Sequence, residues 1–469
     1  MKILFVEPRG AFANVFEKSM SIPMLGPVYL ATILGEAGFD VSIINENILN
    51  RKISEKELAS ADILCVSCMT ATVNRGKEIA REYKTIRDMY GKRTRSIIGG
   101  IHASMLPEDV ANDFDQVFVG EAENDIIDVI TGVRDEKIVY GSALKNLDDL
   151  PIPDFTYLKG WEKMKVVPIM TSRGCPYDCN FCSVTEMFGR GYRTRSIDYV
   201  IEEFARHQDK KIFFADDHFV VDKKRAHALL DRLAMYDYSK SWSAQLRTEV
   251  SKDEALVRKM KNAGCNMVYI GLESVNQKSL DEIQKKQSVE DIKRSVQVFQ
   301  DNGIHVHGMF MLGSDSDDKH IFKATSEFCL RSGITSAQYL ILTPLPGTAL
   351  YRRLEKENRI LHRNWEYYDA MHVVFNPKNF TPAELQQGMI ECFSDFYSYT
   401  ESMNEAVNAV FDSIAVFFKK LYSRTRFPSL MPALIKLFGH KIVKNWIAHN
   451  QNYLAYLNNL EIRRHNLGE

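Results

Sequence analysis

Short apolar runs that alternate with amphipathic segments are the feature that most restricts the fold of this chain. In the N-terminal part the runs cover residues 3–6, 41–45, 63–67, 96–98 and 116–119, and helical patterns cover residues 28–36 and 76–89. Short buried strands separated by helices indicate a parallel sheet with helices on both faces. We therefore predict a doubly wound, Rossmann-like α/β domain over residues 1–145.

Small and polar residues follow the predicted strands of this domain. Sheets of this kind bind ligands at the carboxyl ends of their strands. Glycines there allow close backbone approach to a bulky ligand, and hydroxyl groups can bond its amides. The candidate residues are Ser67, Thr70, Gly99, Gly100, His102, Gly120 and Glu121. The alternatives are an ordinary Rossmann-like turn for the two adjacent glycines and a solvated or backbone-bonded ring for His102.

The alternation of strands and helices resumes after an acidic stretch that contains Pro151 and Pro153. This stretch predicts an extended linker over residues 146–165. Beyond it, apolar runs predict strands at residues 166–170, 211–215, 241–246, 267–271, 304–312 and 338–342. Several helices between them end at a glycine, which suits the left-handed position after a helix. Six strand–helix units predict an incomplete (βα)6 barrel over residues 166–360.

Three of the eight cysteines, Cys175, Cys179 and Cys182, lie within eight positions just after the first strand of this barrel. Gly174 and Pro176 suit a tight turn that lets three thiolates converge. A structural zinc site normally has four protein ligands, and a bacterial ferredoxin run continues to a further cysteine and a proline. Three thiolates therefore favour an iron–sulfur cluster with one open iron. A chance group of cysteines or a zinc clip is the alternative.

The overall charge favours no particular macromolecular partner. Sixty basic and sixty-one acidic residues give a net charge of -1, which argues neither for nor against a nucleic-acid partner. We expect none. Cysteines without regular pairing favour a reducing compartment. Glu7 and Pro8 interrupt the first apolar run before it reaches the length of a signal-peptide core, and no run has the roughly 18 residues of a spanning helix. We expect a cytoplasmic protein, attached at most to a membrane surface.

The Cys-x-x-x-Cys-x-x-Cys spacing, with Phe181 before the last cysteine, resembles the signature of radical S-adenosylmethionine (SAM) enzymes. The resemblance implies a [4Fe-4S] cluster whose open iron binds SAM, and cleavage of SAM to a 5'-deoxyadenosyl radical. It also implies SAM contacts at the strand ends, from Phe181, Asp216, Asp217, Gln245, Arg247, Glu273 and Gly313. Asp216 or Asp217 would replace a glutamate that the family often has. A helix cap or a solvated turn is the alternative for this acidic pair.

The upstream loops, with residues 25–31 and 38–41, resemble the cobalamin-binding domain that precedes some radical SAM domains. The chain is identified as a member of the cobalamin-binding-domain-containing radical SAM (class B) family, in the group of the hopanoid methylases and the anaerobic Mg-protoporphyrin ester cyclase. Some cobalamin domains supply a lower axial histidine after the first strand, but residues 9–24 contain none. We expect cobalamin bound without that ligand, or a domain that has lost cobalamin.

The C-terminal region, residues 361–469, has a helical pattern and an uneven charge. No acidic residue occurs between Asp412 and Glu461, while basic residues alternate with aromatic and aliphatic ones. Such a pattern suits an anionic membrane surface, and we expect peripheral membrane contact through residues 413–460. A core-packing helical extension with a basic outer face is the alternative. Residues 372–378, 382–385 and 396–398 also resemble the extension of proteins related to the hopanoid methylases.

Both resemblances together imply a reaction class. The chain is expected to methylate an unactivated carbon of a lipid or isoprenoid-like substrate, with methyl carried by cobalamin and hydrogen removed by the deoxyadenosyl radical. The cluster would need an external one-electron reductant of the flavodoxin or ferredoxin type. One rival function is radical cyclisation or carbon–carbon coupling with the same cofactors. Another is a non-catalytic cobalamin-binding regulator.

Overall fold

The computed structural model describes residues 1–12, 22–236, 241–398 and 431–467. The chain forms two compact units. The first unit comprises Met1–Gln245, Asn262–Cys265 and Pro344–Asp369, and the second comprises Leu246–Lys261, Asn266–Thr343 and Ala370–Glu469. The boundaries at residues 145, 165 and 360 stay predictions, because these units are not divided there.

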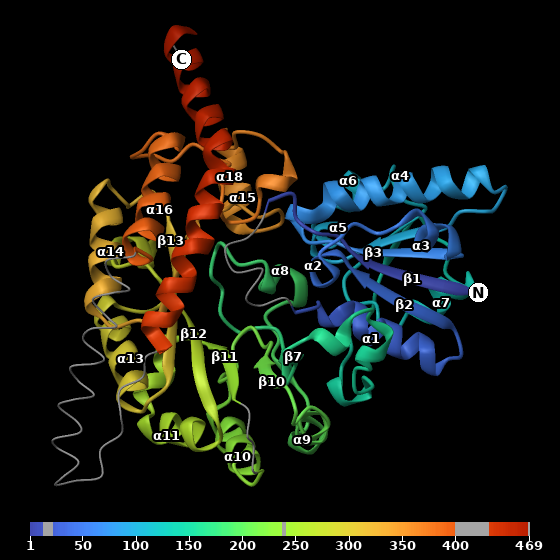
Figure 1. Ribbon diagram of the computed structural model, residues 1–469, viewed down its shortest axis with the longest axis horizontal. Helices are drawn as coiled ribbons and strands as arrows, with labels where there is room; N and C mark the ends of the chain where they lie inside the picture. Colours follow the sequence, from blue (N-terminus) through green and yellow to red (C-terminus); the bar gives the residue numbers. More distant parts are fainter. Residues whose placement is uncertain (13–21, 237–240, 399–430, 468–469) are drawn as a thin grey trace. The chain divides into compact units, whose positions relative to one another are not determined.

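A six-stranded sheet forms the N-terminal part of the first unit (Figure 1). Its strands are β1 (Lys2–Glu7), β2 (Asp40–Asn45), β3 (Ile63–Ser67), β4 (Ser96–Gly99), β5 (Gln116–Val119) and β6 (Ile138–Tyr140). The order is β2-β1-β3-β4-β5-β6, and all neighbouring pairs are parallel. The doubly wound prediction is confirmed. Only β6 was not predicted, because three residues make too short a run to recognise.

The strand order determines on which face of the sheet the connecting helices lie. They are α1 (Leu25–Glu36), α2 (Glu46–Leu49), α3 (Glu55–Ser60), α4 (Val73–Met89), α5 (Ile101–Met105), α6 (Pro107–Val110) and α7 (Ile126–Thr131). The chain leaves β1 towards β2 on one side and leaves β3 towards β4 on the other. Right-handed crossovers therefore place α1 and α4 on opposite faces. The strand order reverses between β1 and β3, and sheets of this kind bind ligands at the carboxyl edge at such a point.

The second sheet contains the six strands predicted for the barrel. They are β7 (Val166–Ile169), β10 (Lys211–Phe214), β11 (Trp242–Leu246), β12 (Cys265–Glu273), β13 (His305–Leu312) and β14 (Ser336–Ile341). The sheet order is β14-β13-β12-β11-β10-β7, so β7 and β14 are its edges and the barrel is incomplete. Its helices are α9 (Ile197–Arg206), α10 (Lys223–Leu233), α11 (Glu254–Asn262), α12 (Gln277–Glu282), α13 (Val289–Asp301), α14 (His320–Arg331) and α15 (Ala349–Lys356).

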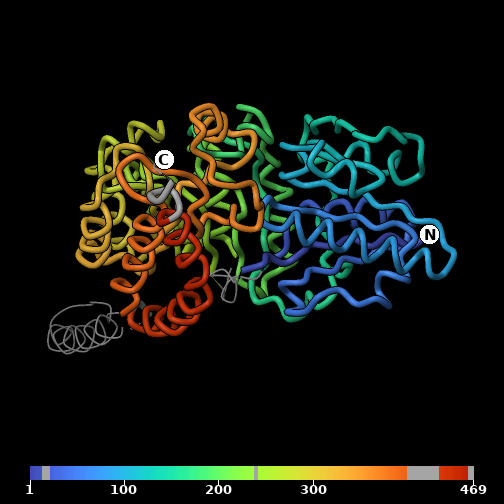
Figure 2. The backbone as a smooth tube through the Cα atoms, turned by 90° about the horizontal axis from the view of Figure 1, so that it is seen from above, coloured from blue at the N-terminus to red at the C-terminus, as the bar shows by residue number. Residues whose placement is uncertain are grey.

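The predicted helical C-terminal region is present in the second unit. It contains α16 (Pro382–Phe396) and the long α18 (Met431–Leu467). A capping box at Thr381 and Pro382 in the first turn begin α16. The two helices lie side by side in both views (Figure 1 and Figure 2), and the Phe393 and Trp446 rings are 5.5 Å apart. Among the described residues, no helix is both long enough and apolar enough to cross a membrane.

Glu203 makes the stability of the first unit depend on pH. Its side chain lies on α9, is fully buried, and has no hydrogen-bond partner within the described part of the chain. Burial raises the pKa of Glu203 to about 8, despite the opposing charge of Arg195. Between its usual pKa of 4.5 and about 8, the folded chain holds a proton that the unfolded chain has released. Stability therefore falls as pH rises through this window, by up to about 1.4 kcal/mol per pH unit.

We expect Glu203→Gln to weaken this pH dependence, because glutamine keeps the shape of the side chain but cannot ionise. The melting temperature should rise relative to wild type at about pH 8 and change little at about pH 5. Thermal unfolding across this range measures the effect. Glu202→Gln is the matched control, since Glu202 is 61% exposed on the same helix and pairs with Arg206. An unchanged pH dependence in Glu203→Gln would contradict the assignment.

Candidate functional site

A two-stranded ribbon holds both ends of the cysteine loop. β8 (Ser172–Arg173) pairs antiparallel with β9 (Arg193–Thr194), with Arg173 opposite Arg193. Gly174 follows β8 with φ of +89°, and a Cβ there would overlap the carbonyl group of Gly191. Only glycine fits this position without strain. The two ends of the cysteine loop, residues 174–192, are therefore held next to each other by the ribbon.

The three cysteines of the cysteine loop are each half-buried. Cys175, Cys179 and Cys182 are all of intermediate exposure, and the Cys182 N–H donates to the Cys179 carbonyl at 3.1 Å. Burial raises the pKa of the Cys182 thiol to about 11, and the nearby charges of Cys179, Asp217 and Cys175 act in the same direction. Cys175, Cys179 and Asp217 therefore lie near enough to Cys182 to affect its pKa, and the role of the three cysteines as cluster ligands stays a prediction.

The structure does not by itself group these thiols around one metal ion. Within the described ranges, no three His, Cys, Asp or Glu side chains are grouped as ligands of one metal ion. A [4Fe-4S] cluster takes one thiolate on each of its ligated irons, so its ligands need not converge on one point. Cys175, Cys179 and Cys182 are the residues that would hold it.

The adjacent Asp216 and Asp217 have different surroundings. Asp216 is fully buried and accepts hydrogen bonds from the Thr171 N–H at 2.7 Å, the Thr171 hydroxyl at 2.6 Å and the Ser172 N–H at 2.9 Å. It therefore ties the end of β10 to the turn before the cysteine loop. Asp217 instead lines a cavity, and burial raises its pKa to about 6. Of the two predicted SAM ligands, Asp217 is the one that faces open space.

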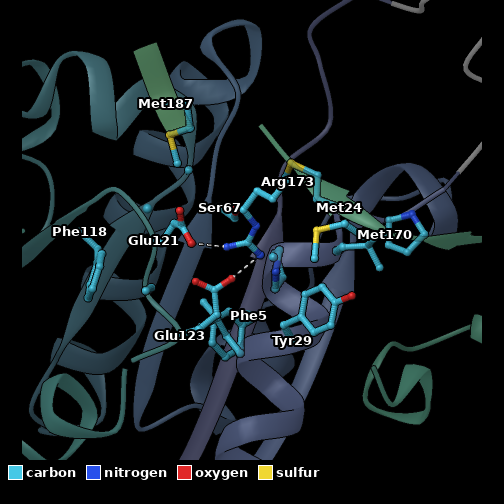
Figure 3. Close-up of a pocket in the computed structure, with 18 of the residues that line it drawn as sticks. Phe5, Met24, Tyr29, Ser67, Phe118, Glu121, Glu123, Met170, Arg173 and Met187 are labelled. Atoms are coloured by element: carbon cyan, nitrogen blue, oxygen red, sulfur yellow. Dashed lines mark hydrogen bonds and ion pairs between the residues drawn. The ribbon is translucent and has the colours of Figure 1, made fainter. Parts of the chain in front are cut away.

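This cavity has a volume of about 390 Å³ and lies at the carboxyl edge of the first sheet (Figure 3). The predicted residues Ser67, Gly99, Gly100, Gly120 and Glu121 line it. So do several large apolar side chains: Phe5, Met24, Tyr29, Phe118, Met170 and Met187. Met187 belongs to α8 (Val184–Phe188), which directly follows the last cysteine. One cavity thus adjoins both the predicted cobalamin loops and the cysteine loop.

The two adjacent glycines of the cavity have different structural roles. Gly100 has φ of +93°, and a Cβ there would lie 2.5 Å from the Cys68 carbonyl oxygen. Gly99 has no such constraint, since a Cβ there would lie 3.9 Å from the Cβ of Phe118. Gly100 lets β3 and β4 end close together, whereas Gly99 keeps the wall of the cavity open. The open wall at Gly99 leaves room for a bulky ligand such as cobalamin, whereas the constraint at Gly100 concerns the packing of the two strand ends.

Thr70 and His102 do not line the cavity. Thr70 is buried at the start of a short 3-10 helix, Thr70–Thr72. His102 is also buried, with its Nε2 3.2 Å from Asp109 Oδ2 and its ring 5.3 Å from that of Trp365. Burial lowers the pKa of His102. Their contact with cobalamin stays a prediction.

The remaining residues predicted to bind SAM are divided between the two units. Phe181 is half-buried in the cysteine loop of the first unit, and Gln245, on β11, ends the first segment of that unit. In the second unit, Arg247 and Glu273 both contact Lys285, Arg247 through the Lys285 carbonyl and Glu273 through the ammonium group. Gly313 donates its N–H to Asp317 at 3.1 Å. Lys285 was missed because it lies on a polar stretch outside every predicted strand end.

Two further residues beside the cavity, Arg173 and Glu123, were not predicted. Their side chains are paired at 2.7 Å and almost fully buried. A signal for them existed, because Arg173 directly precedes the Gly-Cys of the cysteine motif and Glu123 belongs to the same loop as Gly120 and Glu121.

The C-terminal basic segment is only partly described. Residues 413–430, where the membrane prediction begins, lie outside the described residues. On α18, Leu434, Leu437 and Phe438 are exposed, with Phe438 at 70%. Lys436 is buried, with its ammonium group 4.4 Å from the centre of the Phe396 ring. It therefore adds no charge to the outer surface of α18.

Two family models match the chain. The B12 binding domain matches residues 18–130, and the Radical SAM superfamily matches residues 169–328. An uncharacterised methyltransferase of Pyrococcus horikoshii is 30% identical over 437 residues, which cover 85% of this chain and 92% of that protein. Bacteriochlorophyllide d C-12(1)-methyltransferase of Chlorobaculum tepidum is 25% identical, covering 84% of this chain and 87% of that protein.

More distant comparisons agree with the same architecture. Hopanoid C-2 methylase of Rhodopseudomonas palustris is 26% identical, covering 77% of this chain and 71% of that protein. Among solved structures, the cobalamin-dependent SAM radical enzyme OxsB, with aqua-cobalamin and SAM bound, has a TM-score of 0.66. The match covers 100% of this chain and 81% of that chain at 14% identity, and so supports the fold alone.

Proposed function

The chain belongs to the cobalamin-binding radical SAM enzymes, and from this premise we propose that it methylates an unactivated carbon of a lipid or isoprenoid-like substrate. It is a cobalamin-dependent radical SAM enzyme of the methyltransferase type, with a [4Fe-4S] cluster, SAM and cobalamin as cofactors. The observation that supports methyl transfer best is a cavity lined by both the Gly99–Gly100 turn and Asp217, in a chain whose relatives include two methyltransferases.

When bound, the cluster and SAM supply a radical that removes hydrogen, and cobalamin supplies the methyl group. The residues of this chain bind and orient these groups. Cys175, Cys179 and Cys182 would hold the cluster, and Gly99 would admit the cobalamin ring. The apolar wall of the cavity would exclude water from the reacting carbon.

Three observations support an apolar, lipid-like substrate. The cavity is lined largely by apolar side chains, and hopanoid C-2 methylase is a relative. Exposed Leu434, Leu437 and Phe438 on α18 lie close in sequence to exposed Lys441 and Lys444, a combination that suits an anionic lipid surface. We propose peripheral membrane contact there. Co-sedimentation with anionic but not with neutral phospholipid vesicles would support this contact.

Anaerobic reconstitution with iron, sulfide and cobalamin tests the reaction. The protein is incubated with a reductant of the flavodoxin or ferredoxin type, a bacterial lipid extract and SAM that carries a deuterated methyl group. We expect a lipid in which one labelled methyl group replaces a hydrogen atom, together with 5'-deoxyadenosine that carries this hydrogen. A cyclised or coupled product without the label would instead indicate the cyclase reaction. Intact SAM in the reduced, reconstituted protein would indicate a regulator.

A further inference from the structure

Buried ion pairs connect the cysteine loop to the loop after β5. Arg173 Nη1 is 2.6 Å from Glu121 Oε2, and Arg173 Nη2 is 2.7 Å from Glu123 Oε1. The side chains of Arg173, Glu121 and Glu123 are only 8%, 4% and 7% exposed. Figure 3 shows the guanidinium group of Arg173 between the two carboxylates. The planar guanidinium thus bridges two carboxylates, one through each Nη, and its fixed geometry sets their direction as well as their distance.

A second arginine completes this network. Arg193 lies opposite Arg173 in the ribbon, donates to Glu121 Oε2 at 3.1 Å and also donates to the Leu144 carbonyl. Residues at the two ends of the cysteine loop therefore reach the same carboxylate. Arg173 also lies 5.6 Å from the ring centre of Phe188, at the end of α8. The network thus contacts the loop at its start, in α8 and at its end.

The positive and negative charges of this network compensate one another. Two arginines face two glutamates, so the group is neutral as a whole. Burial alone would raise the pKa of Glu121, but Arg193 and Arg173 outweigh it and hold that pKa below its usual value. Removal of one partner would leave a buried charge without compensation. Buried pairs of this kind often add little net stability, so a role in positioning explains the network better than one in overall stability.

The carboxylates belong to the loop that forms one wall of the cavity. Gly120, Glu121 and Ala122 line it, as do Arg173 and Phe188 on the side of the cysteine loop. We infer that Arg173 is a positioning residue that holds the cysteine loop and the loop after β5 in one arrangement, so that the radical and the methyl donor act on the same substrate molecule. This inference rests on the proposed function. Without the pairing, SAM cleavage should continue but should no longer lead to methyl transfer.

Hydrogen exchange on the cofactor-free protein tests the positioning without any assay of activity. Arg173→Met keeps the length and apolar stem of the side chain but removes its charge. We expect faster exchange in peptides from residues 174–192 and unchanged exchange in α4 and α10. Arg190→Met is the matched control, because Arg190 lies in the same loop but its 2.5 Å pair with Asp178 is exposed. Equal exchange in both variants and wild type would overturn the inference.

The ratio of 5'-deoxyadenosine to methylated product then tests the coupling in reconstituted enzyme. We expect Arg173→Met to retain iron and cobalamin and to raise this ratio at least about tenfold, with partial recovery in Arg173→Lys. A ratio like that of wild type would overturn the inference, as would equal loss of both products. Should Arg173→Met fail to fold, Glu123→Gln replaces it, since that change leaves the Arg173–Glu121 pair. If wild type makes no methylated product, the proposed function fails while the exchange result still decides the positioning role.

Discussion

Alanine at Cys175, Cys179 and Cys182 is expected to remove the iron–sulfur absorbance and all reductant-dependent release of 5'-deoxyadenosine. Each thiolate would ligate one iron, so the variant has no ligands left for a cluster. The fold should survive, because the Ser172–Arg173 and Arg193–Thr194 ribbon and the buried Asp216 hold the ends of the loop independently of the thiols. Iron content, the absorption spectrum and mass spectrometry of the nucleoside products measure the effect.

Cys329→Ala is the matched control for this loss. Cys329 is fully buried on α14, and burial raises the pKa of its thiol, as expected for a packing residue. This variant should bind iron and cleave SAM as wild type does. Retained cleavage in the triple alanine variant would contradict the assignment of the cluster ligands, and lost cleavage in Cys329→Ala would show that the assay reports general damage.

The sheets were predictable from the sequence because their strands are continuous apolar runs. A strand buried on both faces leaves this local signal wherever it lies, and the runs at residues 63–67 and 116–119 coincide with β3 and β5. β6 has only three residues, Ile138–Tyr140, and leaves almost no signal. The cysteine motif was equally easy to recognise, because the three expected cluster ligands lie on one short segment.

The surroundings of single side chains were less predictable. Asp216 and Asp217 are neighbours in sequence, and only contacts with Thr171, 45 residues away, show that Asp216 is the buried one. Arg173 and Glu121 are 52 residues apart, so no local pattern links them. Lys436 lies in the basic stretch of residues 413–460, for which membrane contact is expected, but it packs over Phe396. Long-range packing decides each of these cases, and a single sequence does not display it.

Leucine at Gly99 is expected to weaken cobalamin binding at least about tenfold and to reduce methyl transfer with it, while SAM cleavage continues. Gly99 ends β4 and lines the cavity, and its φ is not in the left-handed region, so a side chain is compatible with its backbone. The nearest non-neighbouring atom to an added Cβ is Phe118 Cβ at 3.9 Å. A leucine side chain would therefore extend into the cavity instead of disrupting the sheet.

Gly99→Ala is the control that distinguishes steric exclusion of cobalamin from damage to the fold. Its single methyl group meets only ordinary van der Waals contact, so cobalamin should still bind with at most a modest loss. Gly99→Leu should bind at least about tenfold more weakly, as loss of shape complementarity in a packed site predicts. Absorbance of protein-bound cobalamin after gel filtration measures this, and circular dichroism checks the fold. Normal cobalamin binding by a folded Gly99→Leu variant would place the cofactor outside this cavity, because a leucine side chain and the ring cannot occupy the same space.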